Sequence, residues 1–286
     1  MQGFPWWCLE HLGEDAKWAI EDIGAHLSNR TWLVTQKQSC ALPTKTNTTH
    51  KFIVKQFQNE SEFARNNQAV IRLDKYIADQ GLGPQVVFVS NDYHVIAYEH
   101  IEQPMVMALD SQQACIEKLA EVLVRIHQLT PEVASVPVRS QMEQYCKALA
   151  LFDETEAMRM REDIDAYHAL FEKCEQEPQV FCHNDLSMDH VFLTPELKII
   201  DWEYAGYNHP GMDLAMTVVM NDLYDEEIGW LLDSYNAKAE HPVLRDELPD
   251  WLRLVALVNR IWFKLQEAVT REATADEEMP LDELLA

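Results

Sequence analysis

Basic residues are scarce in this chain of 286 residues, in which 23 lysines and arginines stand against 48 aspartates and glutamates. The formal net charge of −25 repels nucleic acid and anionic membrane surfaces, and it favours a cationic ligand. The alternative interpretation is a merely acidic surface that keeps the protein soluble, as in a salt-adapted source. The charge therefore predicts no nucleic-acid partner and no membrane partner, and it leaves open whether the field steers a ligand.

Long apolar runs and paired cysteines are also missing. No run approaches the ~20 apolar residues that a membrane helix needs, and the N-terminus has no basic segment followed by an apolar core. The six cysteines form no C-x-x-C pair and no zinc spacing, so reduced thiols are expected. We therefore expect a cytoplasmic protein without structural zinc, and the sequence does not predict its oligomeric state.

Strand signals are concentrated in the first third of the chain. Residues 31–36 alternate like a strand, residues 51–57 form a second strand, and two β-rich runs on either side of "ND" at 91–92 indicate a hairpin. Residues 61–80 carry a helical pattern that ends at "GLGP". Residues 8–27 show no strong periodicity, and we interpret them as helix or loop.

Helical patterns dominate after residue 104, at 111–130, at 140–175 and from Pro210 onward. Strands in one part and helices in another predict an α+β fold rather than a βαβ alternation. We therefore expect a strand-rich N-terminal lobe and a mostly helical C-terminal lobe joined by a short connector. The expected boundaries are 1–98, 105–286 and, for the connector, 99–104.

Ionisable residues gather between Val180 and Gly206, around two short apolar runs that "TPE" joins. Pairing these runs as a hairpin would bring Asp185 and Asp201 to one edge. Two carboxylates there repel each other unless a proton or a cation lies between them, and Mg²⁺ suits one or two carboxylates plus phosphate oxygens. The alternative is that both aspartates cap turns and bind backbone amides.

The pattern H-x-D at 183–185, an apolar strand at 191–193 and "IIDWEYAG" at 199–206 together resemble the aminoglycoside phosphotransferase and choline kinase superfamily. The likeness is greatest to choline, ethanolamine and thiamine kinases. Weaker matches follow in the family's order between residues 26 and 270, namely "HLSNRTWLV", "FIVKQF", "GLGP", "VLVRIHQL" and "HPGMDLA". The resemblance implies a bilobal protein-kinase-like fold, with a nucleotide-binding N-terminal lobe, a hinge, and a C-terminal lobe that holds the catalytic loop and the substrate pocket.

The same resemblance implies an ATP-dependent small-molecule kinase that uses Mg²⁺. Asp185 would be the catalytic base, Asp201 would hold the metal ion, and Lys55 would reach the α- and β-phosphates. His183 and Asp213 would support the catalytic loop. Other contacts to the nucleotide are implied for the loop residues Ser28 and Asn29 and, through the backbone of the hinge, for Tyr98, Glu99 and Ile101.

Three features depart from the family pattern. His190 stands where the family has an asparagine as second metal ligand, and histidine suits softer metals better than Mg²⁺. Gln68 stands where the glutamate partner of Lys55 is expected, and Glu62 would replace it only in another helix register. The nucleotide loop has no glycine, and the whole chain has only 8. These departures keep open a catalytically silent, kinase-like binding protein.

The acceptor pocket is predicted from aromatic and acidic side chains. The candidates are Trp202, Glu203, Tyr204, Trp262 and Phe263. Such side chains bind cationic groups through cation–π contacts, although core packing is the alternative for the last two. The predicted substrate is a small cationic alcohol of the choline, ethanolamine or thiamine type. An aminoglycoside fits the charge equally, and a macrolide fits His190, so an antibiotic phosphotransferase is the alternative.

Overall fold

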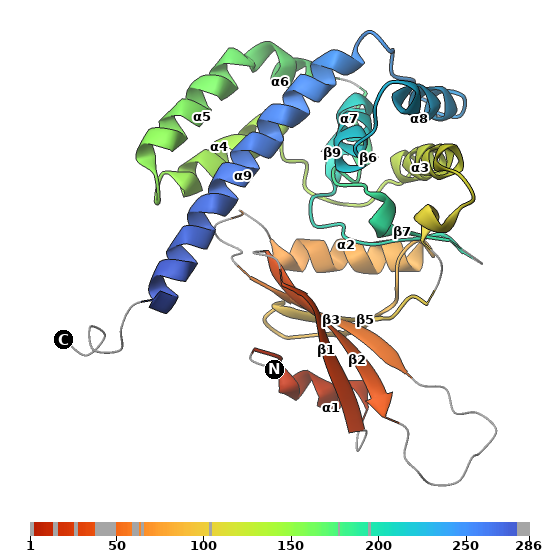
Figure 1. Ribbon diagram of the computed structural model, residues 1–286, viewed down its shortest axis with the longest axis vertical. Coiled ribbons are helices and arrows are strands. Elements are labelled where there is room, and N and C mark those ends of the chain that lie inside the picture. The colour runs from red at the N-terminus through yellow and green to blue at the C-terminus, as the bar shows by residue number, and fades with distance from the viewer. Residues whose placement is uncertain are drawn as a thin grey trace. The chain divides into compact units, whose positions relative to one another are not determined.

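The computed structural model describes residues 3–13, 17–25, 28–37, 50–58, 63, 66–102, 105–176, 178–193 and 196–278 (Figure 1). The chain divides into two compact units. The first consists of Met1–Glu60, Arg65–Pro104 and Val191–Ile200, and the second of Ser61–Ala64, Met105–His190 and Asp201–Ala286. An antiparallel sheet dominates the first unit and helices dominate the second, which confirms the predicted α+β class.

The first unit contains a five-stranded antiparallel sheet in the order β1-β2-β3-β5-β4. Its strands are β1 (Lys17–Ala25), β2 (Asn29–Lys37), β3 (Lys51–Phe57), β4 (Val86–Val89) and β5 (Val95–Glu99). The predicted strands at 31–36 and 51–57 and the predicted hairpin are confirmed. The interpretation of residues 8–27 as helix or loop was wrong for β1, and it holds for η1 (Trp6–Cys8) and α1 (Leu9–Leu12).

Both faces of this sheet bury apolar side chains. Trp32 and Val54 pack on one face against Phe4 and Cys8 of the N-terminal segment. On the other face Phe57 packs against α2 (Asn67–Asp79). Because side chains alternate along a strand, Lys55 lies on the same face of β3 as Phe57.

Helix α2 begins later than the predicted 61–80. The side chain of Asn66 caps its first turn by accepting a hydrogen bond from the Ala69 amide at 3.0 Å. The helix ends before Gly81, whose φ of +73° is the left-handed conformation that glycine adopts without strain. Glu62, the alternative partner for Lys55, lies outside the described residues.

The second unit is built from helices and confirms the helical patterns predicted after residue 104. They are α3 (Gln112–His127), α4 (Val138–Leu149), α5 (Glu154–Ala166), α6 (His168–Glu175), α7 (Pro210–Met220), α8 (Glu226–Asn236) and α9 (Leu248–Glu278), with the short η2 (Val106–Ala108). The long helix α9 packs along α4 and α7, and α3 packs on α8 (Figure 1). Among the described residues, none of the helices combines the length and apolarity needed to span a membrane.

Two short antiparallel strand pairs organise the segment between α6 and α7. Strand β6 (Val180–Cys182) pairs with β9 (Gly206–Asn208), and β7 (Val191–Phe192) pairs with β8 (Lys198–Ile199). The β7–β8 pairing confirms the hairpin predicted around "TPE". The one-turn helix η3 (Met188–His190) leads directly into β7.

Candidate active site

The β7–β8 hairpin brings together the chain segments on either side of it. Val191 is opposite Ile199, so His190 and Asp201, one and two residues beyond that pair, are held close to each other. The Nε2 atom of His190 lies 3.7 Å from Oδ2 of Asp201. Asp185 joins them, and one ligand atom from each of the three side chains lies within 4.8 Å of the others. We call Asp185, His190 and Asp201 the ligand cluster.

A backbone carbonyl sets the orientation of the His190 ring. Its Nδ1 lies 2.9 Å from the carbonyl oxygen of Asp185. Because a carbonyl oxygen only accepts hydrogen bonds, Nδ1 must carry the proton in this contact. In the neutral imidazole the lone pair is then on Nε2, the nitrogen that faces Asp201. The ligand cluster therefore presents two carboxylates and an imidazole nitrogen, which are all groups that bind divalent cations.

Two residues of the site have a left-handed backbone. Asn184 has a φ of +60° and Asp201 a φ of +69°. Asparagine and aspartate adopt this conformation more readily than other non-glycine residues, and such strain is typical of functional sites. The Asn184 side chain donates to the Tyr204 carbonyl at 3.0 Å and accepts from Asn208 at 3.2 Å. These bonds connect the loop that carries Asp185 to the loop that carries Asp201.

Asp213, in the first turn of α7, anchors the loop that carries Asp185. Its fully buried carboxylate accepts hydrogen bonds from the backbone amides of His183 at 3.0 Å and Asn184 at 2.7 Å. His127 Nε2 lies 3.0 Å from the same carboxylate. Burial alone would raise the pKa of Asp213, but the hydrogen bonds and the histidines beside it outweigh burial and lower the pKa below its usual 3.8.

Sequence reasoning missed several residues that support this loop. His127 contacts Asp213 with one ring nitrogen and the Tyr235 hydroxyl with the other, at 2.7 Å. Cys182 lies beside them, and we call His127, Cys182 and Asp213 the anchor cluster. Asn221, just after α7, donates to the Leu186 carbonyl at 3.0 Å and accepts from the Met188 amide at 2.8 Å. The family-like string "VLVRIHQL" was the only signal for His127, and nothing in the sequence indicated Asn221.

His183 is buried under an aromatic layer. Its ring centroid lies 4.7 Å from that of Trp202 and 5.8 Å from that of His190. Trp202 also stacks on Phe181 at 5.9 Å and is itself buried. Trp202 therefore belongs to the core, and the prediction that it offers an aromatic face to a substrate was wrong.

The other predicted substrate residues form a group around Tyr204. The indole nitrogen of Trp262 donates to the Tyr204 hydroxyl at 3.1 Å, and the two rings meet edge to face. Phe263 touches Trp262 with its ring but is 55% exposed. Burial, and then the charges of Glu203 and Asp185, raise the pKa of Tyr204 well above 10, so its hydroxyl stays neutral.

Ser28 and Asn29 are buried where β2 begins. Asn29 donates to the Ser28 hydroxyl at 3.1 Å, and the Ser28 carbonyl accepts from the Gln58 amide at 2.8 Å. The backbone bond connects the start of β2 to the end of β3, and the side-chain bond joins the two neighbours to each other.

Lys55 and its neighbours lie on the face of the sheet that α2 covers. The Lys55 ammonium is 5.6 Å from the centroid of the Phe57 ring. Gln68 is half-buried on α2, whereas Asp74 on the same helix is buried and accepts a hydrogen bond from the Tyr98 hydroxyl at 2.6 Å. Asp74 is an acidic residue of α2 that the sequence analysis did not single out.

The predicted hinge begins in regular strand pairing. The Glu99 amide donates to the Gln85 carbonyl at 2.9 Å, and the His100 amide to the Lys51 carbonyl at 3.2 Å. Ile101 follows directly in irregular backbone. Residues 103–104 of the predicted hinge lie outside the described residues.

A family model shows to which protein family the chain belongs. A model of the phosphotransferase enzyme family matches residues 19–255. The chain belongs to this phosphotransferase family. Membership confirms the resemblance to the aminoglycoside phosphotransferase and choline kinase superfamily.

The proteins to which this phosphotransferase is similar include choline kinases and ethanolamine kinases. The structure of choline kinase LicA from Streptococcus pneumoniae is 20% identical and covers 91% of this chain and 88% of its own, with a TM-score of 0.67. An ethanolamine kinase from Plasmodium vivax is 13% identical, with coverages of 89% and 77% and a TM-score of 0.67. At these identities the two structures show a shared protein-kinase-like fold.

The sequence matches to curated relatives are shorter. Protein LicA of Haemophilus influenzae is 28% identical over 131 residues, which are 44% of this chain and 48% of that protein. The chain therefore spans about half the length of this relative.

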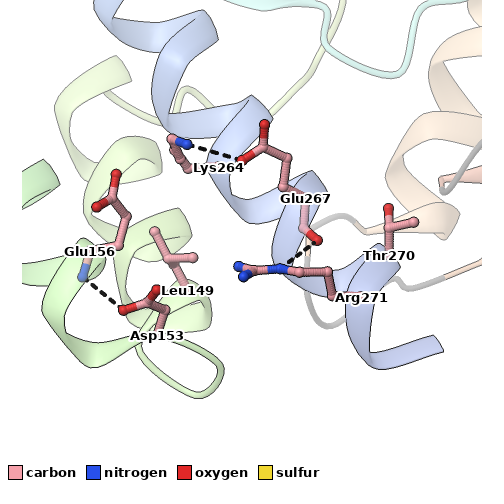
Figure 2. A pocket seen from close by; sticks show the side chains of 7 residues that line it. All are labelled: Leu149, Asp153, Glu156, Lys264, Glu267, Thr270 and Arg271. Carbon is pink, nitrogen blue, oxygen red and sulfur yellow. Dashed lines mark hydrogen bonds and ion pairs between the residues drawn. The ribbon is translucent and has the colours of Figure 1, made fainter. Parts of the chain in front are cut away.

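A cavity of about 510 Å³ lies elsewhere in the second unit, between the α4–α5 turn and α9 (Figure 2). It is lined by Leu149, Asp153, Glu156, Lys264, Glu267, Thr270 and Arg271. Many of its polar groups already have partners, since Asp153 caps α5 and Lys264 pairs with Glu267 at 3.0 Å (Figure 2). Its lining includes no residue of the ligand cluster, so we do not assign the chemistry to this cavity.

Proposed function

We propose that the protein is an ATP-dependent phosphotransferase that phosphorylates the hydroxyl of a small cationic molecule. The observation that carries the proposal is the ligand cluster, in which Asp185, His190 and Asp201 present two carboxylates and an imidazole nitrogen within 4.8 Å. Family membership supports the reaction type. The convergence of groups that suit a cation–phosphate complex supports an active enzyme over a silent relative.

Within this proposal each acidic residue has its own role. Asp185 orients the acceptor hydroxyl and takes its proton as the γ-phosphoryl group is transferred. Asp201 and His190 would hold the divalent cation, Mg²⁺ in the family pattern, which when bound neutralises charge on the ATP phosphates. Asp213 keeps the loop of Asp185 in place through its bonds to the amides of His183 and Asn184.

The nucleotide contacts are proposed for the first unit. Lys55 contacts the α- and β-phosphates. The backbone around Tyr98, Glu99 and Ile101 receives the adenine, and the start of β2 at Ser28 and Asn29 covers the phosphates. Gln68 takes the place of the acidic partner of Lys55 by hydrogen bonding without neutralising it.

A cationic acceptor is supported by the group around Tyr204. The 3.1 Å hydrogen bond from the Trp262 indole nitrogen to the Tyr204 hydroxyl holds the two rings together. Glu203 adds a half-exposed carboxylate and Phe263 an exposed ring. Fixed aromatic faces beside a carboxylate bind an ammonium group through cation–π and Coulomb attraction. The relatives named as choline and ethanolamine kinases support an amino alcohol of this kind.

The test is an ATP-consumption screen over choline, ethanolamine, thiamine, an aminoglycoside and a macrolide. For choline the matched control is 3,3-dimethylbutan-1-ol, which has the same shape without the positive charge. We expect one amino alcohol to be phosphorylated, with its kcat/KM about 10-fold or more above that of its neutral isostere. Equal rates for the isostere would exclude the cationic pocket.

A silent binding protein predicts a different result in the same samples. It would consume no ATP with any acceptor, although ATP at a hundred times its Kd would still stabilise the fold by about 2.7 kcal/mol. Phosphorylation of the aminoglycoside or the macrolide alone would favour the antibiotic alternative.

A further inference from the structure

The Nε2 atom of His190 has the environment of a metal ligand, because the other ring nitrogen, Nδ1, is held by the protein. Histidines that bind metals almost always donate the other ring N–H to a carboxylate, a backbone carbonyl or a water. His190 Nδ1 does this to the carbonyl of Asp185 at 2.9 Å. The backbone carbonyl therefore fixes the tautomer that leaves the Nε2 lone pair directed toward Asp201.

The distance between His190 and Asp201 fits one shared ion. Two ligands that are each about 2.1 Å from an ion lie at most about 4.2 Å apart. His190 Nε2 and Asp201 Oδ2 are 3.7 Å apart, which is beyond a hydrogen bond and within that limit. One cation bound by both atoms therefore fits between them.

The donor set discriminates between cations. Mg²⁺ requires hard oxygen ligands in near-ideal octahedral geometry, and an imidazole is a poor ligand for it. Mn²⁺ accepts carboxylates as Mg²⁺ does, and as a transition metal it also accepts an imidazole nitrogen. An imidazole beside the Asp201 carboxylate therefore suits Mn²⁺ better than Mg²⁺.

We infer that His190 Nε2 is a direct metal ligand and that it makes the site selective for Mn²⁺ over Mg²⁺. The inference deepens the proposed function, on which its catalytic meaning rests. The exchange of asparagine for histidine at this position then changes the cation with which the enzyme works and leaves the phosphoryl-transfer chemistry unchanged.

The experiment measures binding of Mn²⁺ alone, without ATP or acceptor. Protein is titrated with Mn²⁺ while electron paramagnetic resonance follows the signal of the free ion, and Mg²⁺ is then added as competitor. We expect Mn²⁺ to bind at least about 10-fold more tightly than Mg²⁺. In pulsed spectra the bound ion should show coupling to a ¹⁴N nucleus of the imidazole.

His190→Asn is the matched variant because it replaces the imidazole with an amide oxygen donor. It should lose at least about 10-fold in Mn²⁺ affinity together with the ¹⁴N coupling, and keep its Mg²⁺ affinity. His168→Asn, the same change at an exposed histidine of α6 paired with Glu172, should alter neither. The wild-type ¹⁴N signal decides the question even if His190→Asn does not fold.

The outcomes separate this inference from the proposed function. Absence of ¹⁴N coupling in the wild type, or equal affinities for Mn²⁺ and Mg²⁺, overturns the inference whatever the activity. Selective Mn²⁺ binding with ¹⁴N coupling supports it even if every acceptor in the ATP-consumption screen fails, in which case only the proposed function is lost.

Discussion

The anchor cluster and the ligand cluster contain similar side chains in opposite environments. In the anchor cluster the side chains of His127 and Asp213 are 6% and 0% exposed, and both ring nitrogens of His127 contact protein atoms. In the ligand cluster His190 and Asp201 are 17% and 31% exposed, and their closest polar atoms are 3.7 Å apart. Burial with complete hydrogen bonding suits a structural support, whereas partial exposure with one nitrogen directed at a carboxylate suits the proposed ligand site.

The third member of the anchor cluster strengthens this contrast. Burial, and then the negative charge of Asp213, raise the pKa of the Cys182 thiol well above 9.0. Because a metal binds the thiolate and not the thiol, Cys182 is a poor ligand at neutral pH. The anchor cluster is therefore less suited to a metal than the ligand cluster, although its donor atoms are as close together.

The largest expected effect is on turnover in the ligand cluster. Asp185→Asn keeps the size of the side chain but removes the proton acceptor, so kcat should fall by about 10²- to 10⁴-fold. The free energy of unfolding should change by less than about 1 kcal/mol, because the residue is half-exposed. Steady-state kinetics and urea unfolding measure the two quantities.

Asp189→Asn is the control for this variant, since Asp189 is exposed four residues further along the same loop. Its turnover should stay within about twofold of the wild type. Normal turnover by Asp185→Asn would contradict the assignment of Asp185 as the base. It would also mean that the ligand cluster does not differ from the anchor cluster by a role in catalysis.

The second effect is on stability in the anchor cluster. Asp213→Ala leaves two backbone amides and His127 without their buried acceptor, so the free energy of unfolding should fall by about 3 kcal/mol or more. Asp246→Ala, at an exposed aspartate, should change it by less than about 0.5 kcal/mol. Urea denaturation of the three proteins makes the comparison, and a loss below about 1 kcal/mol for Asp213→Ala would show that the two clusters do not differ as argued.

The smallest effect is a dependence on pH. The pKa of Asp213 is below its usual 3.8, so its stabilising contribution is fully present above that pH and is lost as the pH falls toward the folded-state pKa. The difference in unfolding free energy between the wild type and Asp213→Asn should therefore shrink between neutral pH and about pH 3. Denaturation at several pH values measures it, and a difference independent of pH would mean that the carboxylate is not charged in the fold.

The sequence predicted the regular strands β3, β4 and β5. It did not predict β1, because that strand is irregular. Strand β3 and the β4–β5 hairpin are short runs rich in β-branched and aromatic residues beside turn residues, so their sequence was sufficient. In β1 Trp18 and Ile20 pack on the core, but the pairing with β2 shifts register between Asp22 and Gly24. This irregularity leaves Ile23 49% exposed and breaks the two-residue period on which the prediction depends.

The ligand cluster was accessible from sequence because a short hairpin connects its members. The anchor cluster was not, because His127 and Asp213 are 86 residues apart and meet through side chains of two helices. Trp262 and Phe263 show a second limit of prediction from sequence. Neighbours on a helix point about 100° apart, so only one of them faces Tyr204, and the sequence did not show which.

The start of α7 has a consequence for the order in which the protein matures on the ribosome. A side chain at Gly211 would come within 2.3 Å of the Trp251 indole nitrogen, so α9 packs directly against the turn that carries Asp213. Translation proceeds from the N-terminus, and α9 (Leu248–Glu278) is the last helix of the described chain to emerge. A nascent chain that already contains every residue of the ligand cluster must therefore wait for its C-terminal helix before the loop of Asp185 acquires its final support.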